Sequence, residues 1–248
     1  IKNIVLKNKI NLIIPITKYD LKILSLNKEK LRLYNCEVLV SSYNLIKNLL
    51  NKESAYFFCK KKNIKTPKIY SNFKEVSFKK SKQFIRKKKF GNSSVGIKII
   101  KKLNKNHFKK NYVIQDFIYG KELHFDILND FNGDYLASCV KQKIAMRSGE
   151  TDKAKTLYSK KFENLAKKIS YAFRHIGNMD CDAIIKKNGT VFFLDFNPVF
   201  GGGYPFTHLS GFNYIKAILN LKKNKRPSFP HKPKIVKMAK GISVHIIK

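Results

Sequence analysis

The stretch Val191 to Gly211, VFFLDFNPVFGGGYPFTHLSG, decides how the rest of the chain is interpreted. Its apolar start predicts a strand that carries Asp195 and Asn197 at its end, before Pro198 and three glycines stop it. Because alternate side chains of a strand share a face, Asp195 and Asn197 point the same way. A carboxylate and an amide oxygen side by side are hard ligands that suit Mg²⁺ better than zinc. Taken alone, a plain strand followed by a Gly-rich turn explains these residues equally well.

The composition allows a substantial core and gives no sign of membrane insertion or secretion. The 248 residues are enough for one large domain or two small ones. No apolar run approaches the roughly 20 residues of a membrane span, and no segment has the pattern of a signal peptide. The four cysteines are scattered without a CxxC pair, which favours free thiols in a reducing compartment. We therefore expect a cytoplasmic protein with no membrane partner.

The formal net charge of +36 suggests a nucleic-acid-binding module. The lysines, however, are spread over nearly the whole chain, with no Arg-rich segment, RNP-like pattern or zinc finger, so we expect no specific nucleic-acid partner. The acids are placed more selectively. Of sixteen Asp and Glu, five lie outside residues 116–195, so eleven lie within them. A basic chain that gathers its carboxylates in one third of its length suggests a site that needs them.

The first half of the chain predicts a βα unit followed by helices and a hairpin. Short strands at 10–15 and 36–40 flank a helical pattern, as in the end of a parallel-sheet domain whose first strands would precede Ile1. A helix that Ser41 and Ser42 can cap is expected to run through Leu50, and a second helix is expected at about 52–62. Strands are expected at 83–87 and 97–100. The loop between these strands is rich in small residues, Gly91, Ser93, Ser94 and Gly96, whose backbone N–H groups could bind phosphates. A flexible hairpin tip has the same composition, and no Walker motif is present.

The second half predicts a sheet with one long helix. Asn132-Gly133 between alternating segments is typical of a β-hairpin. Residues 153–176 are expected to form the longest amphipathic helix, with Gly177 as its C-cap. A strand with Asp180 and Asp182 on one face then leads into the stretch quoted above. A helix at 214–221 and a basic tail with a short strand, GISVHII, complete the chain.

Three motifs in this order resemble the ATP-grasp superfamily, and most closely its carbamoyl-phosphate-synthase-large-subunit-like branch. They are FIRKKKFGNSSVG (84–96), QDFIYGKELHFDIL (115–128) and GNMDCDAIIKKNGTVFFLDFNPVFGGGYP (177–205). The resemblance covers about residues 10–221 and implies an α+β ATP-grasp fold, in which two α+β subdomains clasp ATP, preceded by a truncated α/β Rossmann-like segment. The implied domains are 1–45 (the Rossmann-like piece), 46–221 (the ATP-grasp domain, with a linker at 46–67, a small lid at 68–113 and a large subdomain at 114–221) and 222–248 (the tail).

The resemblance also implies a function and a set of site residues. ATP with Mg²⁺, or Mn²⁺ as the alternative ion, would activate a small-molecule carboxylate as an acyl phosphate that an amine or ammonia attacks. The phosphates would be held by Lys87 (with Arg86 as a neighbouring alternative) and the loop 91–96. Adenine would be held by the segment Gln115, Asp116, Phe117 and Ile118, the ribose by Glu122, and the metal by Asp195, Asn197 and Asp182 (or Asp180). The basic residues Lys141, Lys143 and Arg147 would face the acyl phosphate or the substrate. A homodimer stays open as an assembly.

One departure from the family pattern bears on activity. The metal strand of the family usually reads Glu-x-Asn-Pro-Arg, whereas this chain has Asp195 in place of Glu and Val199 in place of Arg. Losing a fixed cation at the phosphates could cost on the order of 10²–10³ in rate. Either another cation, Arg147 or Lys141, substitutes for it, or the protein is a slow or degenerate nucleotide binder. His124 and His208 are weaker candidates for a base near this site.

Overall fold

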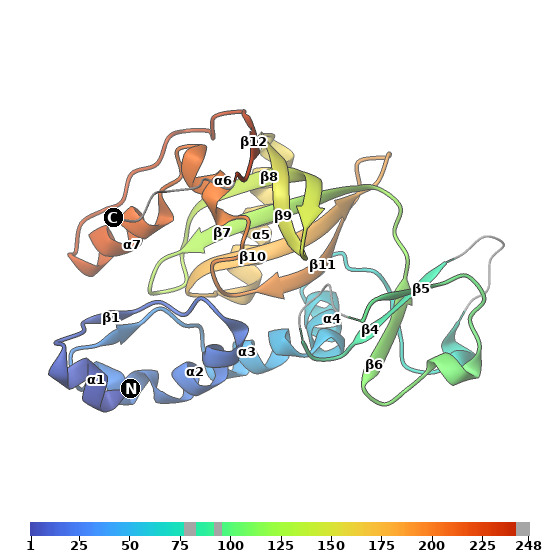
Figure 1. Ribbon diagram of the computed structural model, residues 1–248, viewed down its shortest axis with the longest axis horizontal. Coiled ribbons are helices and arrows are strands. Elements are labelled where there is room, and N and C mark those ends of the chain that lie inside the picture. The colour runs from blue at the N-terminus through green and yellow to red at the C-terminus, as the bar shows by residue number, and fades with distance from the viewer. Residues whose placement is uncertain (77–82, 92–95, 242–248) are drawn as a thin grey trace, which may run out of the picture.

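The computed structural model describes residues 1–76, 83–91 and 96–241, and these residues form three sheets with helices around them (Figure 1). The helices are α1 (Lys2–Lys7), α2 (Lys18–Arg32), α3 (Tyr43–Leu50), α4 (Lys52–Lys61), α5 (Lys160–Phe173), α6 (Tyr204–Leu209) and α7 (Tyr214–Lys222). The strands are β1 (Leu12–Ile13), β2 (Glu37–Val38), β3 (Ile69–Tyr70), β4 (Phe84–Lys88), β5 (Lys98–Ile100), β6 (Tyr112–Asp116), β7 (Lys121–Asn129), β8 (Tyr135–Arg147), β9 (Glu150–Leu157), β10 (Gly177–Ile185), β11 (Val191–Asn197) and β12 (Lys237–Ala239).

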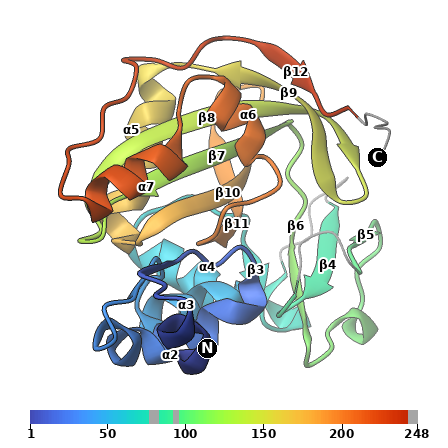
Figure 2. The ribbon, with the colours of Figure 1, turned by 60° about the vertical axis from the view of Figure 1, so that its left-hand side comes forward.

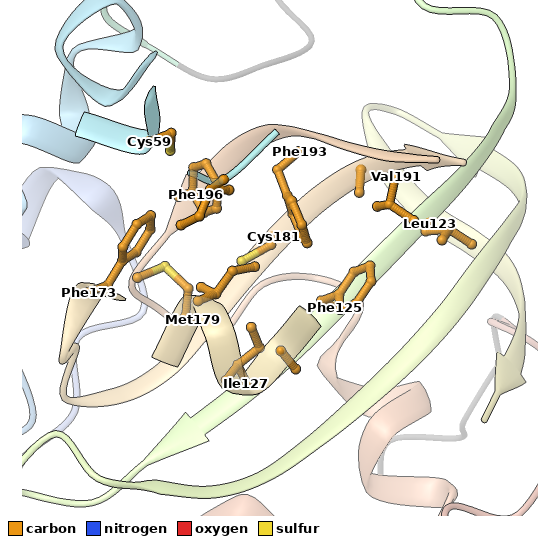
Figure 3. Packing of buried hydrophobic residues seen from close by; sticks show 14 of the residues in the cluster. Cys59, Leu123, Phe125, Ile127, Phe173, Met179, Cys181, Val191, Phe193 and Phe196 are labelled. Atoms are coloured by element: carbon orange, nitrogen blue, oxygen red, sulfur yellow. The ribbon is translucent and has the colours of Figure 1, made fainter. Parts of the chain in front are cut away.

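A six-stranded antiparallel sheet in the order β11-β10-β7-β8-β9-β12 forms the centre of the molecule. One face of this sheet is apolar and packs against α5, and α4 joins the same cluster (Figure 3). Alternation along β7 and β10 puts Phe125, Met179 and Cys181 on this face. The intervening residues, among them Asp126 and Asp180, therefore lie on the opposite face. There, α6 and α7 cover one end of the sheet (Figure 2).

A β-bulge shapes the end of β11. Asp195 lies opposite Asp182 on β10, but the next register pair joins Phe193 to Ala183, so Leu194 is an extra residue. The extra residue shifts the alternation by one position. As a result Phe193 and Phe196 both enter the apolar cluster, while Asp195 and Asn197 stay on the polar face.

The N-terminal segment is a small βαβ unit. β1 and β2 are parallel and joined through α2, and the helix buries Leu21, Leu24 and Leu31. Val199, which follows the end of β11, lies in the same apolar cluster as these leucines. The expected pattern of strand, helix and strand is confirmed for the described residues. That the unit belongs to a Rossmann-like domain stays a prediction, as do the domain boundaries.

The small sheet, in the order β3-β6-β4-β5, has its own apolar cluster around Phe84 and Ile114 and lies beside the large sheet (Figures 1 and 2). The start of α4 holds this sheet in place. The amide of Lys52 donates to the carbonyl of Lys89 at 3.0 Å, and the Lys89 ammonium lies 2.6 Å from Glu53. None of the helices in the described part of the chain has the length and apolar character that a membrane span requires.

Two sequence expectations are wrong or fall outside the described residues. Residues 150–157 form β9 rather than the start of a long helix, because they pair with β8, and Thr151, Ala154 and Thr156 are buried along the strand. The helix begins only after Ser159, whose side chain accepts a hydrogen bond from the Phe162 amide, and it ends at a left-handed Arg174 rather than at Gly177. The expected strand GISVHII spans 241–247 and, apart from Gly241, lies outside the described residues, and β12 precedes it.

A buried histidine connects the end of α5 to β7. His175 donates from Nε2 to the Ile127 carbonyl at 3.1 Å, and its Nδ1 lies 3.4 Å from the amide nitrogen of Asn129, whose oxygen accepts from Ser170. Burial lowers the pKa of His175 to about 4 from its ordinary 6.5. Below pH 6.5 the unfolded chain therefore binds a proton that the folded protein does not, and stability falls until about pH 4.

We expect the wild type to lose about 2 kcal/mol of unfolding free energy between pH 7 and pH 5 through His175 alone, since one pKa unit corresponds to about 1.4 kcal/mol. In the His175→Gln variant this part of the pH dependence disappears, although the variant is less stable at pH 7. Urea unfolding at both pH values measures the difference, with the exposed His231→Gln as the control. An equal pH dependence in His175→Gln and wild type would contradict the assignment.

Candidate functional site

Polar side chains from four neighbouring strands form two rows across the open face of the large sheet. The register places Asn197, Asp180 and Asp126 in one row. The next row consists of Asp195, Asp182, His124 and Lys141. These rows arise from strand alternation, because on β11, β10 and β7 the residue of one row lies two positions from the residue of the other row. The sheet thus concentrates carboxylates on a surface that also carries basic groups.

The three residues predicted to bind the metal lie together in these rows. Asp182 and Asp195 are register partners, and Asn197 follows on the same face. The Asn197 Oδ1 atom is buried and has no hydrogen-bond partner among the residues that the structure describes. Asp182 lies 2.6 Å from the Lys143 ammonium, and Asp195 lies 3.4 Å from that of Lys18. An orphaned amide oxygen beside two carboxylates is a donor set that fits Mg²⁺.

His124 lies at the centre of the acidic cluster. Its Nε2 is 3.3 Å from Asp126 and 3.7 Å from Asp180, and its Nδ1 is 3.4 Å from Asp182. Burial opposes a charge on the ring, but the carboxylates of Asp180 and Asp126 outweigh it and raise the pKa of His124 to about 9. The ring is therefore an imidazolium that neutralises part of the cluster at neutral pH.

The carboxylates differ in how they are compensated. Burial raises the pKa of Asp180 above its ordinary value. For Asp182 burial acts in the same direction, but the hydrogen bond from His124 and the charge of Lys143 hold its pKa well below the usual range. The pKa of Asp126 is likewise lowered, against burial, by Lys141 and His124. Asp126 and Asp182 are thus firmly ionised in this arrangement.

Two of the residues predicted to face the acyl phosphate occupy different environments. Lys141 is 1% exposed, and its ammonium donates to Asp126 Oδ2, to the Gly203 carbonyl at 2.9 Å and to Thr207 Oγ1 at 2.7 Å. These three acceptors account for all of its protons. Arg147 pairs with Asp152 at 2.7 Å and is half exposed. Within the described residues it lines neither cavity at the site, so the structure does not bring it to the cluster.

The three glycines after β11 are required by space rather than by backbone conformation. A Cβ on Gly201 would overlap Asp180 Oδ2, one on Gly202 would lie 2.7 Å from Glu150 Oε2, and one on Gly203 would lie 3.1 Å from His124 Nε2. Positive φ is not found at any of the three. The glycine loop therefore lies directly on the polar cluster, and each glycine makes room for one charged side chain.

Two cavities meet at this cluster. The first, of about 410 Å³, lies between the two sheets and is lined by Ile85, Lys87, Gln115, Glu122 and Asp195, among others. The second, of about 360 Å³, is lined by Lys18, His124, Asn197, Gly202 and Gly203, among others. Both cavities share Lys143, Met146, Gly149 and Asp182. The predicted metal ligands are therefore at the junction of the two spaces.

The residues predicted to bind the nucleotide lie mainly around the first cavity. Lys87 is buried and donates to the Leu194 carbonyl at 3.2 Å, and burial lowers its pKa to about 8 although Asp195 opposes the shift. Its neighbour Arg86 lies instead over the ring of Tyr112. Glu122 is exposed, with its carboxylate 4.0 Å from Lys143. The structure thus distinguishes Lys87 from Arg86, which the sequence left as alternatives.

The hinge segment and the small-residue loop are only partly placed. Gln115 is buried on β6, and Asp116 accepts a hydrogen bond from the Tyr70 hydroxyl at 2.8 Å. Phe117 and Ile118 are half-buried in the connection to β7. Gly91 and Gly96 have φ of 109° and 78°, in the left-handed region that favours glycine. Ser93 and Ser94 lie outside the described residues, and His208 is exposed on α6.

Sequence reasoning missed two lysines at this site. Lys18 lines the second cavity, and the buried Lys52 donates from its ammonium to the Gly91 carbonyl at 3.0 Å. Burial lowers the pKa of Lys52. In a chain with 52 Lys and Arg no local signal marks these two, and only the tertiary fold brings them to the cluster. Sequence reasoning also overlooked Asp126. Its position between the apolar Phe125 and Ile127, two residues after His124, is a local pattern that puts it on the same face as His124.

A family profile described as "ATP-grasp domain" matches residues 50–203, which include the four-stranded sheet, five strands of the large sheet and all the described lining residues of the two cavities except Lys18. The chain belongs to the ATP-grasp family. The resemblance to this superfamily and the α+β ATP-grasp fold are therefore confirmed. The more specific carbamoyl-phosphate-synthase-like branch stays a prediction. No curated protein matches the sequence.

Solved structures share the ATP-grasp fold at low sequence identity. Biotin carboxylase from Campylobacter jejuni in complex with β-γ-ATP superposes with a TM-score of 0.74 at 11% identity, over 94% of this chain and 59% of that chain. N5-carboxyaminoimidazole ribonucleotide synthetase from Thermotoga maritima superposes with a TM-score of 0.63 at 15% identity, over 86% of this chain and 59% of that chain. L-amino acid ligase from Bacillus licheniformis superposes with a TM-score of 0.66 at 14% identity, over 90% of this chain and 58% of that chain. The chain thus spans less than two thirds of the length of these proteins, and the likeness establishes the fold alone.

Gly201→Ala tests whether the glycine loop rests on the acidic cluster. The new methyl group would overlap the Asp180 carboxylate, so we expect a loss of about 1–3 kcal/mol in unfolding free energy. In an Asp180→Ala background the same change should cost much less, because the overlapping carboxylate is gone. Gly241→Ala, where a Cβ meets no atom of the described part of the chain within 4 Å, is the matched control. Additive effects of Gly201→Ala and Asp180→Ala in chemical unfolding would contradict the contact.

Proposed function

We propose that the protein is an ATP- and Mg²⁺-dependent ligase that activates a carboxylate as an acyl phosphate for attack by an amine or ammonia. The observation that carries the proposal is the position of Asp182, Asp195 and Asn197 at the junction of two cavities. A phosphoryl group that moves between two substrates must pass a point that both substrates reach. The predicted metal ligands stand at such a point.

The first cavity is the proposed nucleotide site. Its walls include apolar side chains such as Ile85 and Ile97, which suit a base, together with the ammonium of Lys87 and the carboxylate of Glu122. The buried Lys52 lies beside the start of the small-residue loop, so it adds a second cation on the phosphate side. Lys87, Lys52 and Lys143 would bind the phosphate oxygens, and Glu122 would accept hydrogen bonds from the ribose.

The second cavity is the proposed acceptor site. Asp182, Asp195 and Asn197 would hold Mg²⁺, which supplies charge neutralisation on the transferring phosphate when bound. An acceptor carboxylate oxygen attacks the γ-phosphorus, the bond to the β-phosphate oxygen breaks, and ADP leaves. The amine then attacks the acyl carbon, loses a proton, and expels inorganic phosphate to form the amide. The chain's part is to position both substrates and to supply the cations.

Lys141 takes a different role in this proposal from the one that its position in the sequence implied. With its three protons donated to Asp126, Gly203 and Thr207, it holds the glycine loop against β7 and β8. We assign it as a positioning residue. Lys143, two residues along the strand, lines both cavities and is the cation that strand β8 offers to substrates.

Val199 supports a second candidate, a nucleotide-binding protein without ligase activity. Its side chain is 7% exposed within the N-terminal cluster, so this position offers no cation to the phosphates. The two candidates share the nucleotide site and differ only in turnover.

Metal dependence tests the site that both candidates share. We expect ATP binding that requires Mg²⁺, and a loss of at least tenfold in affinity in Asp195→Ala and in Asn197→Ala, because each removes one metal ligand. Titration calorimetry with and without Mg²⁺ measures this, with Asp134→Ala, an exposed carboxylate paired with Arg174, as the control. Equal binding with and without metal, or unaffected variants, would refute the metal assignment.

Acceptor-dependent turnover separates the ligase from the binder. Incubation with Mg²⁺-ATP and a panel of amino acids, other carboxylates and amines should release ADP and phosphate only when an acceptor is present. Hydroxylamine added in place of the amine should trap the acyl phosphate as a hydroxamate. Binding of Mg²⁺-ATP without acceptor-dependent release over the panel would favour the non-catalytic candidate.

A further inference from the structure

Lys18 reaches the site from a part of the chain that the ATP-grasp match does not include. The match begins at residue 50, whereas Lys18 is the first residue of α2 in the N-terminal unit. Its ammonium lies 3.4 Å from Asp195 Oδ2, and its side chain is 22% exposed. It lines the second cavity and not the first. The polar face of the large sheet thus receives a cation, Lys18, from the N-terminal unit.

The N-terminal unit is held at the end of β11 by packing. Val199 is buried in the same cluster as Val5, Leu21 and Leu24. The backbone at this point is fixed as well, because the Asn178 side-chain amide donates to the Val199 carbonyl at 3.0 Å. The two residues after Asn197 therefore connect a predicted metal ligand directly to the cluster that supports α2.

These two observations account for the departure at position 199. An arginine there would have to place a guanidinium inside an apolar cluster, which is costly without a partner. The apolar Val199 instead makes the cluster continuous across the junction. The cation that the sequence lacks at 199 is matched by one that the packed N-terminal unit brings to Asp195.

We propose that Lys18 binds the transferring phosphoryl group from the acceptor side, and that Val199 serves to dock the N-terminal unit that delivers it. This inference rests on the proposed ligase site. Lys18 lines the second cavity and Lys87 lines the first, and Asp182 lines both. A divalent cation bound to Asp195 would repel the Lys18 ammonium. The flexible four-carbon side chain of Lys18 would let the ammonium turn from the carboxylate to an anion in the second cavity.

The test separates nucleotide binding from phosphate binding. Calorimetry first measures the affinity for Mg²⁺-ADP, and then the affinity of the Mg²⁺-ADP complex for inorganic phosphate. For Lys18→Met we expect Mg²⁺-ADP affinity within about threefold of wild type and phosphate affinity lower by tenfold or more. Turnover should fall on the order of 10²–10³. Lys18→Arg should recover part of both losses, and Lys22→Met, an exposed lysine one turn along α2, should change neither.

Val199→Ala provides a second variant that leaves the charge of the site untouched. It should lower phosphate affinity in the same direction as Lys18→Met, by a smaller factor, because the N-terminal unit is less firmly docked. Val199→Ile, which keeps the apolar bulk, should retain wild-type phosphate affinity. If the phosphate affinity depends on Lys18 but not on Val199, the phosphate-binding role of Lys18 stands and the docking role of Val199 is refuted.

Each remaining outcome decides one of the two proposals. Unchanged phosphate affinity and turnover in Lys18→Met refute the role of Lys18 while the ligase proposal stands. ADP release that does not depend on an acceptor, or the absence of any ADP release, refutes the ligase proposal. The affinity of the Mg²⁺-ADP complex for phosphate then still tests whether Lys18 binds phosphate. A wild type that does not bind Mg²⁺-ADP refutes both. Thermal unfolding of every variant identifies any loss that comes from unfolding of α2.

Discussion

The buried ion pair between Asp126 and Lys141 is the interaction on which the site depends. It joins β7 to β8, and the same ammonium donates to the Gly203 carbonyl at the end of the glycine loop and to Thr207 in α6. Breaking a buried pair by removing one partner typically costs about 3–5 kcal/mol, because the remaining charge has no solvent. Here the cost would extend further, since Asp126 also faces His124 and receives the amide of Asn178. One pair thus fixes two strands, the glycine loop and the orientation of the central histidine.

Sheet geometry explains why these charges can be buried at all. Strand alternation gives one face of the sheet an apolar cluster around Phe125, Phe193 and Cys181 (Figure 3). The same alternation puts the charged side chains on the opposite face. The bulge at Leu194 keeps this separation at the end of β11, where unbroken alternation would put Phe193 and Asp195 on the same face. The three glycines complete the arrangement by letting backbone, rather than side chains, cover Asp180 and His124.

How far the sequence predicts this protein depends on whether a feature is local. The shared face of Asp195 and Asn197 and that of Asp180 and Asp182 follow from the period of two along a strand, and the hairpin follows from the turn residues Asn132-Gly133. The structure contains all three. The helix expected from 153 was wrong at its start, because residues 150–157 pair with β8, and the helical pattern of the sequence does not reveal that pairing. Lys18 and Lys52 could not be found, since a lysine at the site has the same local sequence signal as a lysine at the surface. Lys141 was identified as basic and near the site, but its three acceptors come from distant segments, so its burial could not be foreseen.

The balance of charge at the site gives a physical reason for the acids in so basic a chain. Four buried or half-buried carboxylates (Asp126, Asp180, Asp182 and Asp195) face four cations (His124, Lys141, Lys143 and Lys18) among the described residues. His124 and Lys141 are enclosed by the cluster, whereas Lys18 and Lys143 pair with the two carboxylates predicted to hold metal. In the proposed ligase a divalent ion would replace these two ammonium groups at the carboxylates. The displaced ammonium groups would then be available to bind phosphate oxygens. The acids would then keep the lysines in place until a substrate with compensating charge arrives, which a cluster of lysines alone could not do because like charges repel.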